Sequence, residues 1–126
     1  MATARNIPPE SLTAYRATAR QRWAREQEER TRRWEEAWGL ARRAAALLKE
    51  QFGATRVVLF GSLAHGRWFS PTSDVDLAAW GLAPADFFTA VARLQDLAPG
   101  FEVDLVMAER CPPHLWQVIE KEGISL

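Results

Sequence analysis

The chain has 126 residues, of which 48% are hydrophobic and 25% charged, with a formal net charge of zero. This length suits one ordinary domain, and the composition is globular rather than disordered or collagen-like. The apolar runs are far shorter than the roughly 18 residues of a membrane span, and no signal peptide is recognisable. A single cysteine, Cys111, excludes an intramolecular disulfide framework. We therefore expect a cytoplasmic protein.

The charges are divided unequally along the chain. Residues 1–52 hold 11 Lys and Arg against 7 Asp and Glu, whereas residues 53–126 hold 5 against 9. The residue pattern also changes near Gly53, which is a natural place for a helix to stop. We therefore expect an N-terminal helical arm over residues 1–52 and a compact domain over residues 53–126.

The first part of the chain is predicted to be helical from about Pro9 to Phe52. Three consecutive Glu–Arg pairs, each four residues apart, favour a helix between positions 26 and 33. Apolar residues recur every three or four positions from Trp34 onward and predict a packed face. One helix over this span would be about 60 Å long. We expect it either to break near Gly39 or to present its first half as an arm that is solvated, dimerises or grips a partner.

After the arm, short strands and helices are expected to alternate. The pattern predicts strands over residues 56–60, 74–80 and 101–107, a short helical turn over 63–66, and helices over 84–97 and 113–122. This order predicts an α+β (α/β-like) fold, in which a small mixed β-sheet has flanking helices and follows a long helical extension.

Three aspartates occupy alternate positions on two of the predicted strands. Asp74 and Asp76 are two residues apart, so both side chains point to the same face of their strand. Asp104 lies between Val103 and Leu105 on the third predicted strand. If the two strands are neighbours, three carboxylates converge and repel one another. A divalent cation relieves that repulsion, and oxygen ligands favour Mg²⁺ or Mn²⁺ over zinc.

A glycine–serine turn precedes the acidic strand. Gly61 follows a predicted strand and lets the backbone approach a ligand closely, and Ser62 adds a hydroxyl and a backbone N–H suited to an anion. A turn that holds phosphate beside carboxylates that hold metal indicates a site for a metal–nucleoside triphosphate complex.

Taken together, these motifs resemble the minimal nucleotidyltransferases of the DNA polymerase β superfamily. The resemblance covers about residues 52–126 and depends on Phe60-Gly61-Ser62, Gly66, Ser73-Asp74-Val75-Asp76-Leu77 and Val103-Asp104-Leu105. It implies a nucleotidyltransferase fold and a transfer reaction that uses ATP and two Mg²⁺ ions, with Mn²⁺ as a possible substitute.

The resemblance also implies roles for individual residues. Asp74 and Asp76 would bind both metal ions, and Asp104 would bind the catalytic ion and help to deprotonate the acceptor hydroxyl. The triphosphate would be held by the turn residues and two loop residues, namely Gly61, Ser62, Arg67 and Ser73. The family often has arginine where this chain has His65, and Arg67 is a candidate to replace its positive charge.

The chain has little beyond the predicted catalytic unit except its N-terminal helices, so we expect a macromolecular acceptor or a partner subunit to supply the missing surface. The chain is similar to the antitoxins of HEPN–MNT toxin–antitoxin pairs, which implies transfer of AMP from ATP to a tyrosine hydroxyl of a HEPN ribonuclease toxin. The N-terminal helices are one place for that partner, or for a second copy, to bind. The alternatives are a small acceptor such as an aminoglycoside, a non-catalytic antitoxin that acts by binding, and a nucleic-acid-binding module. The glutamates of the arm disfavour nucleic acid, and no membrane association is expected.

Overall fold

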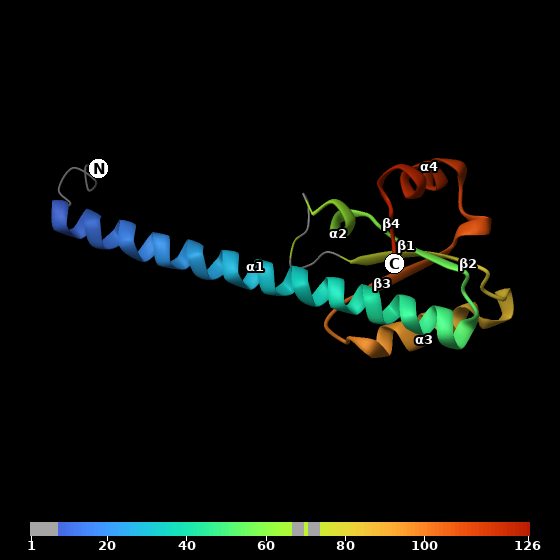
Figure 1. The fold of residues 1–126 in the computed structure, drawn as a ribbon. Helices are drawn as coiled ribbons and strands as arrows, with labels where there is room; N and C mark the ends of the chain where they lie inside the picture. Colours follow the sequence, from blue (N-terminus) through green and yellow to red (C-terminus); the bar gives the residue numbers. More distant parts are fainter. Residues whose placement is uncertain (1–7, 67–69, 71–73) are drawn as a thin grey trace. The chain divides into compact units, whose positions relative to one another are not determined.

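A computed structural model describes residues 8–66, 70 and 74–126 (Figure 1). Its contacts group the chain into two compact units, Met1–Arg32 and Arg33–Leu126. The end of the first helix therefore belongs to the second unit. The domain boundary predicted between residues 52 and 53 stays a prediction, which unfolding measurements can test. No helix in the described ranges is long and apolar enough to cross a membrane.

Helix α1 runs without interruption over Pro9–Phe52, so of the two alternatives considered, the break near Gly39 does not occur. A glycine inside a helix costs only about 1 kcal/mol relative to alanine. The turns on both sides of Gly39 bury a regular apolar face, which offsets that cost. The buried residues of this face are Ala37, Leu40, Ala41, Ala44, Ala45 and Leu48.

A mixed four-stranded sheet forms the centre of the second unit. The strands are β1 (Arg56–Phe60), β2 (Val75–Trp80), β3 (Val103–Met107) and β4 (Ile124–Ser125), in the spatial order β3-β2-β1-β4. Strand β2 is parallel to β3, whereas β1 is antiparallel to both β2 and β4. The fold class predicted from the sequence is confirmed. The two-residue strand β4 was not predicted.

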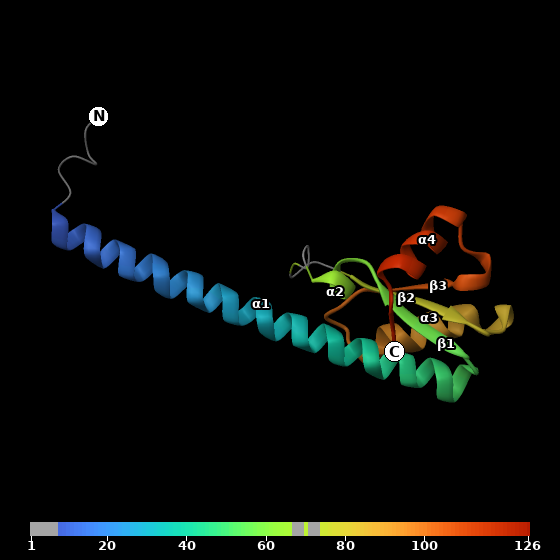
Figure 2. The same ribbon diagram turned by 45° about the horizontal axis from the view of Figure 1, so that its top comes forward.

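Helices cover both faces of this sheet (Figure 2). The end of α1 and helix α3 (Phe87–Leu97) pack on one face, and helix α4 (Pro113–Glu122) packs on the other. The short helix α2 (Ser62–His65) follows β1 directly. Single 3-10 turns occur at Pro84–Asp86 and Ala108–Arg110.

Strict alternation along the strands creates two separate cores. Val57, Leu59, Leu77 and Leu105 belong to the larger core, beneath α1 and α3, whereas Val58, Phe60, Ala78 and Ile119 belong to the smaller core, beneath α4. The even-numbered positions of β2 and β3 therefore face the α4 side of the sheet.

Candidate functional site

Two parallel strands bring the predicted carboxylates together. Asp76 on β2 lies in register with Asp104 on β3, and Asp74 immediately precedes β2. The alternate positions, Val75 and Leu77, are fully buried on the opposite face of the sheet. Because a side chain on a strand alternates faces, burial of these two apolar residues directs Asp76 away from the larger core.

Burial and neighbouring negative charges both affect the electrostatics of the site. The pKa of Asp76 is raised to about 6, mainly by partial burial, then by the negative charge of Asp104 and then by that of Asp74. Burial, followed by the charge of Asp74, also raises the pKa of Asp104. A side-chain hydrogen bond between Asp76 and Asp104 also contributes to the raised pKa of Asp76, and one with Asp74 contributes to the raised pKa of Asp104. Asp74, Asp76 and Asp104 therefore lie close enough for their charges to interact.

The glycine–serine turn lies directly against this cluster. Phe60, the last residue of β1, pairs with Asp76, so the chain enters the turn beside that carboxylate. Gly61 has a φ of 78°, and a Cβ atom added there would lie 2.2 Å from Asp76 Oδ2. Only glycine fits this conformation and this space without displacing a carboxylate. Ser62 then begins α2, whose end is closed by a 2.8 Å hydrogen bond from Gly66 N to Ser62 O.

The donor chemistry of the cluster fits a hard divalent cation. Adjacent carboxylates supply oxygen ligands, and a bound cation would offset the repulsion between their negative charges. However, in residues 8–66, 70 and 74–126, no three Asp, Glu, His or Cys side chains already have an arrangement that could hold a metal ion. The metal assignment therefore stays a prediction.

The structure describes only some of the remaining candidate residues. Arg67 and Ser73 lie outside the described residues, so their roles stay predictions. His65 is exposed at the end of α2. Glu102 is also exposed, and its carbonyl oxygen accepts a 2.9 Å hydrogen bond from Val75 N, which joins the starts of β2 and β3.

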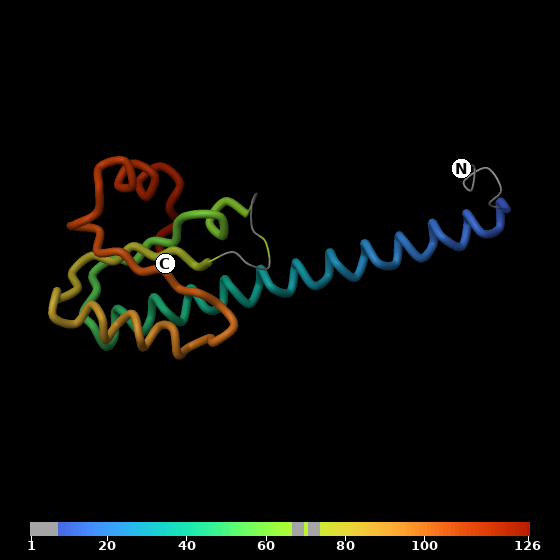
Figure 3. The backbone as a smooth tube through the Cα atoms, turned by 180° about the vertical axis from the view of Figure 1, so that it is seen from behind, coloured from blue at the N-terminus to red at the C-terminus, as the bar shows by residue number. Residues whose placement is uncertain are grey.

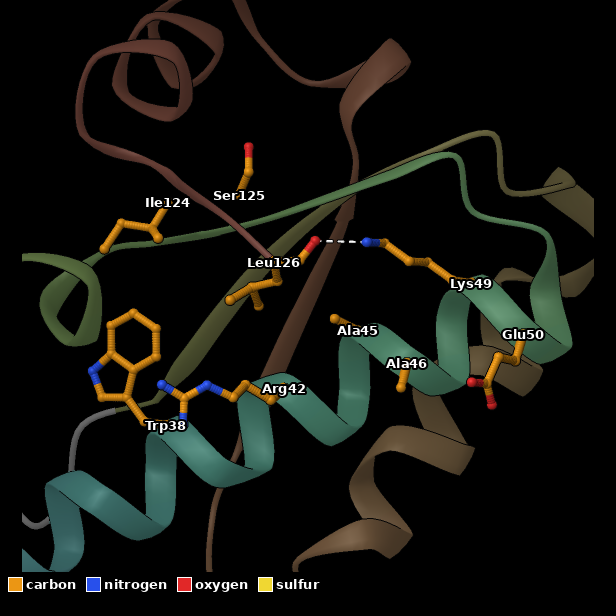
Figure 4. A pocket seen from close by; sticks show the side chains of 9 residues that line it. All are labelled: Trp38, Arg42, Ala45, Ala46, Lys49, Glu50, Ile124, Ser125 and Leu126. Carbon is orange, nitrogen blue, oxygen red and sulfur yellow. Dashed lines mark hydrogen bonds between the residues drawn. The ribbon is translucent and has the colours of Figure 1, made fainter.

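A separate hollow of about 710 Å³ lies between α1 and β4 (Figure 4). Trp38, Ala45 and Leu126 are among its lining residues, and Lys49 Nζ donates a 2.6 Å hydrogen bond to Leu126 O. None of the three aspartates lines this hollow. The hollow is also on the α1 side of the sheet, whereas Asp76 faces the α4 side, so we assign it no part in the candidate site.

Comparison with known proteins identifies a family for the part of the chain that forms the sheet. A family model described as polymerase beta, nucleotidyltransferase matches residues 43–126. A solved toxin–antitoxin structure with AMP-PNP is 24% identical, with a TM-score of 0.55, over 64% of this chain and 67% of that chain. The toxin–antitoxin MntA-HepT is 20% identical, with a TM-score of 0.53, over 68% of each chain.

A further structure, described as a putative minimal nucleotidyltransferase, is 31% identical over 79% of this chain and 94% of that chain, with a TM-score of 0.49. No curated protein matches the chain. The family match covers two thirds of the chain and includes β1, β2 and β3. At identities below 25%, the two toxin–antitoxin structures establish likeness of fold alone.

Proposed function

The chain belongs to the polymerase β nucleotidyltransferase family, and on that premise we propose that it transfers AMP from ATP to a hydroxyl group of a partner protein. The observation that carries the proposal is the cluster of Asp74, Asp76 and Asp104 beside the Gly61 turn. Neighbouring carboxylates that resist joint ionisation suit a reaction in which cations and a triphosphate meet.

In this proposal, each part of the cluster has a distinct role. Asp74, Asp76 and Asp104 would hold two Mg²⁺ ions, which when bound stabilise negative charge on the attacking and leaving oxygens. The Gly61–Ser62 turn would hold the triphosphate, with Arg67 and Ser73 as further contacts. Asp104 would accept the proton of the acceptor hydroxyl. The hydroxyl oxygen then bonds to the α-phosphorus, the bond to the bridging oxygen breaks, and pyrophosphate leaves.

We propose a tyrosine of a HEPN-type toxin as the acceptor. Support comes from the likeness of fold to the MntA-HepT toxin–antitoxin and to the toxin–antitoxin structure with AMP-PNP. A protein acceptor also agrees with the exposed position of Asp104 on β3, which lies at one edge of the sheet order. This exposure leaves the reacting end of the nucleotide accessible to a large molecule.

The first part of α1 is a candidate surface for that partner or for a second copy. Leu12, Tyr15 and Trp23 lie at helical spacing, and they are 37%, 73% and 63% exposed. Four arginines and no acidic residue occur between positions 11 and 25. An apolar stripe on a basic helix fits an apolar groove with an acidic rim.

The test is incubation of the chain with labelled ATP, Mg²⁺ and the protein encoded by the adjacent reading frame. We expect label on that protein, and no label with Asp76→Asn or Asp104→Ala. Asp96→Asn, an exposed aspartate on α3, is the matched control and should retain transfer. Neutralisation of a toxin that survives both site variants would indicate an antitoxin that acts by binding, and label on an aminoglycoside would indicate a small acceptor.

A further inference from the structure

Strand β3 carries Asp104 at the outer end of the sheet order, so β2 is its only strand neighbour among the described strands. An edge strand presents unpaired backbone groups, because no further strand pairs with it on that side. The chain enters β3 from a turn that is closed by a 3.1 Å hydrogen bond from Phe101 N to Ala98 O. The position of Asp104 therefore depends on how this turn is held.

Gln95, on α3, occupies the unpaired side of this entrance. Its side-chain Nε2 donates to Phe101 O, and its Oε1 accepts a 3.2 Å hydrogen bond from Val103 N. One side-chain amide thus donates and accepts along the strand edge, as the backbone of a neighbouring strand would. These bonds are part-buried, so water replaces them less readily than at the surface.

Arg33, on α1, holds the same turn from another element. Its Nη2 donates a 2.6 Å hydrogen bond to Gly100 O, and its Cζ lies 3.8 Å from the centre of the Phe101 ring. Phe101 itself is buried. Figure 3 shows the turn before β3 lying against α1. A planar guanidinium suits this combination of a carbonyl contact and a ring contact.

The register of β3 matters because a shift by one residue moves every side chain to the other face of the sheet. In the observed register, Asp104 lies opposite Asp76, and Glu102 O accepts from Val75 N. Arg33 and Gln95 contact the segment that enters this ladder from outside the two strands.

We propose that Arg33 and Gln95, the turn anchor, are positioning residues that hold β3 in the register that places Asp104 beside Asp76. The inference rests on the proposed function, because the position of Asp104 matters for transfer only if Asp104 takes part in it. The turn anchor itself touches neither nucleotide nor acceptor in this proposal. Its effect on the reaction passes through β3.

The test compares Gln95→Met and Arg33→Lys with Arg93→Ala. Methionine keeps the size of glutamine and loses both hydrogen bonds, and lysine keeps the charge of arginine and loses the planar group. Arg93 is the matched control, because it also joins α3 to α1, through a hydrogen bond to Gln51 that does not involve the turn. Activity is measured at a temperature at which urea unfolding shows every variant to be folded.

For both anchor variants, we expect kcat to fall by about 10- to 100-fold, with KM for ATP within about 3-fold of wild type, as for a displaced reacting group. Amide exchange at Val103 and Val75 should become faster, while exchange at Leu59 in the core should match the control. Mn²⁺ affinity, followed by electron paramagnetic resonance without acceptor, should also fall. The control should keep all three properties.

Either of two results would contradict the proposal that the turn anchor positions Asp104. One is that Gln95→Met equals the control in kcat, Mn²⁺ affinity and exchange at Val103. The other is that activity falls only in proportion to the unfolded fraction and recovers on cooling, as for a merely structural role. If the wild-type chain transfers no nucleotide, the proposed function fails, while exchange at Val103 and Val75 still shows whether the anchor holds β3.

Discussion

Replacing Asp76 by asparagine should stabilise the metal-free protein at neutral pH while abolishing nucleotidyl transfer. The pKa of Asp76 is raised from 3.8 to about 6, chiefly by burial and then by the charges of Asp104 and Asp74. Folding therefore disfavours its ionised form. The difference between these two pKa values corresponds to at most about 3 kcal/mol of folding free energy lost when Asp76 is ionised. Because the side chain is only half-buried, solvent screening reduces this to about 1–2 kcal/mol.

The sign of the pH dependence follows from the raised pKa. The contribution of Asp76 to stability is fully present below its unfolded-state pKa and is lost as the pH rises through about 6. The free energy of unfolding of Asp76→Asn should therefore exceed that of wild type by about 1–2 kcal/mol at pH 7.5 and by almost nothing near pH 4. Urea unfolding in EDTA at several pH values measures this difference, with Asp96→Asn as the control. A variant that is no more stable than wild type at pH 7.5, or a difference independent of pH, would refute the reasoning.

Three further predictions concern the turn, the cation and the smaller core. Gly61→Ala should lower the free energy of unfolding by about 1–3 kcal/mol and abolish transfer, because a Cβ at a φ of 78° would lie 2.2 Å from Asp76 Oδ2. Urea unfolding and a transfer assay check the two effects, and a fully active variant would contradict the close contact. Millimolar Mg²⁺ with a non-hydrolysable ATP analogue should stabilise the wild-type protein by about 1–3 kcal/mol, measured by thermal unfolding. EDTA should reverse this stabilisation, and Asp104→Ala should lack it. An equal shift of the unfolding temperature in the variant would argue against metal binding by Asp104. Ile119→Ala should lower the free energy of unfolding by about 2–5 kcal/mol, because Ile119 of α4 is buried against the sheet. Val118→Ala, at an exposed neighbour, should change it by no more than about 0.5 kcal/mol. Equal losses for the two variants in urea unfolding would contradict the core assignment.

Strand periodicity indicated which side chains of the candidate site share a face, from the alternation of Val75 and Leu77 with the aspartates. The sequence left open whether the two strands are neighbours, and the structure pairs Asp76 with Asp104. The helix over Pro9–Phe52 was also predicted in full, although Gly39 left its continuity open. These features depend on local patterns of three to five residues, which the sequence displays directly.

Other features depend on contacts between distant segments, and no local pattern indicates them. Strand β4 has two residues and exists because the chain after α4 pairs with β1. Gln95 reads as an ordinary polar residue of an amphipathic helix, and Arg33 as one member of a Glu–Arg pair. Their roles at the turn before β3 emerge only when α1 and α3 are packed on the same face of the sheet.

The position of the label on ATP provides the most direct test of the proposed transfer. The chain, Mg²⁺ and the candidate partner are incubated with ATP labelled at either the α- or the γ-phosphate. We predict that the partner retains the α-label and not the γ-label, that pyrophosphate is released, and that Asp104→Ala abolishes both outcomes. Retention of the γ-label, or α-labelling that persists in Asp104→Ala, would contradict nucleotidyl transfer by the aspartate cluster.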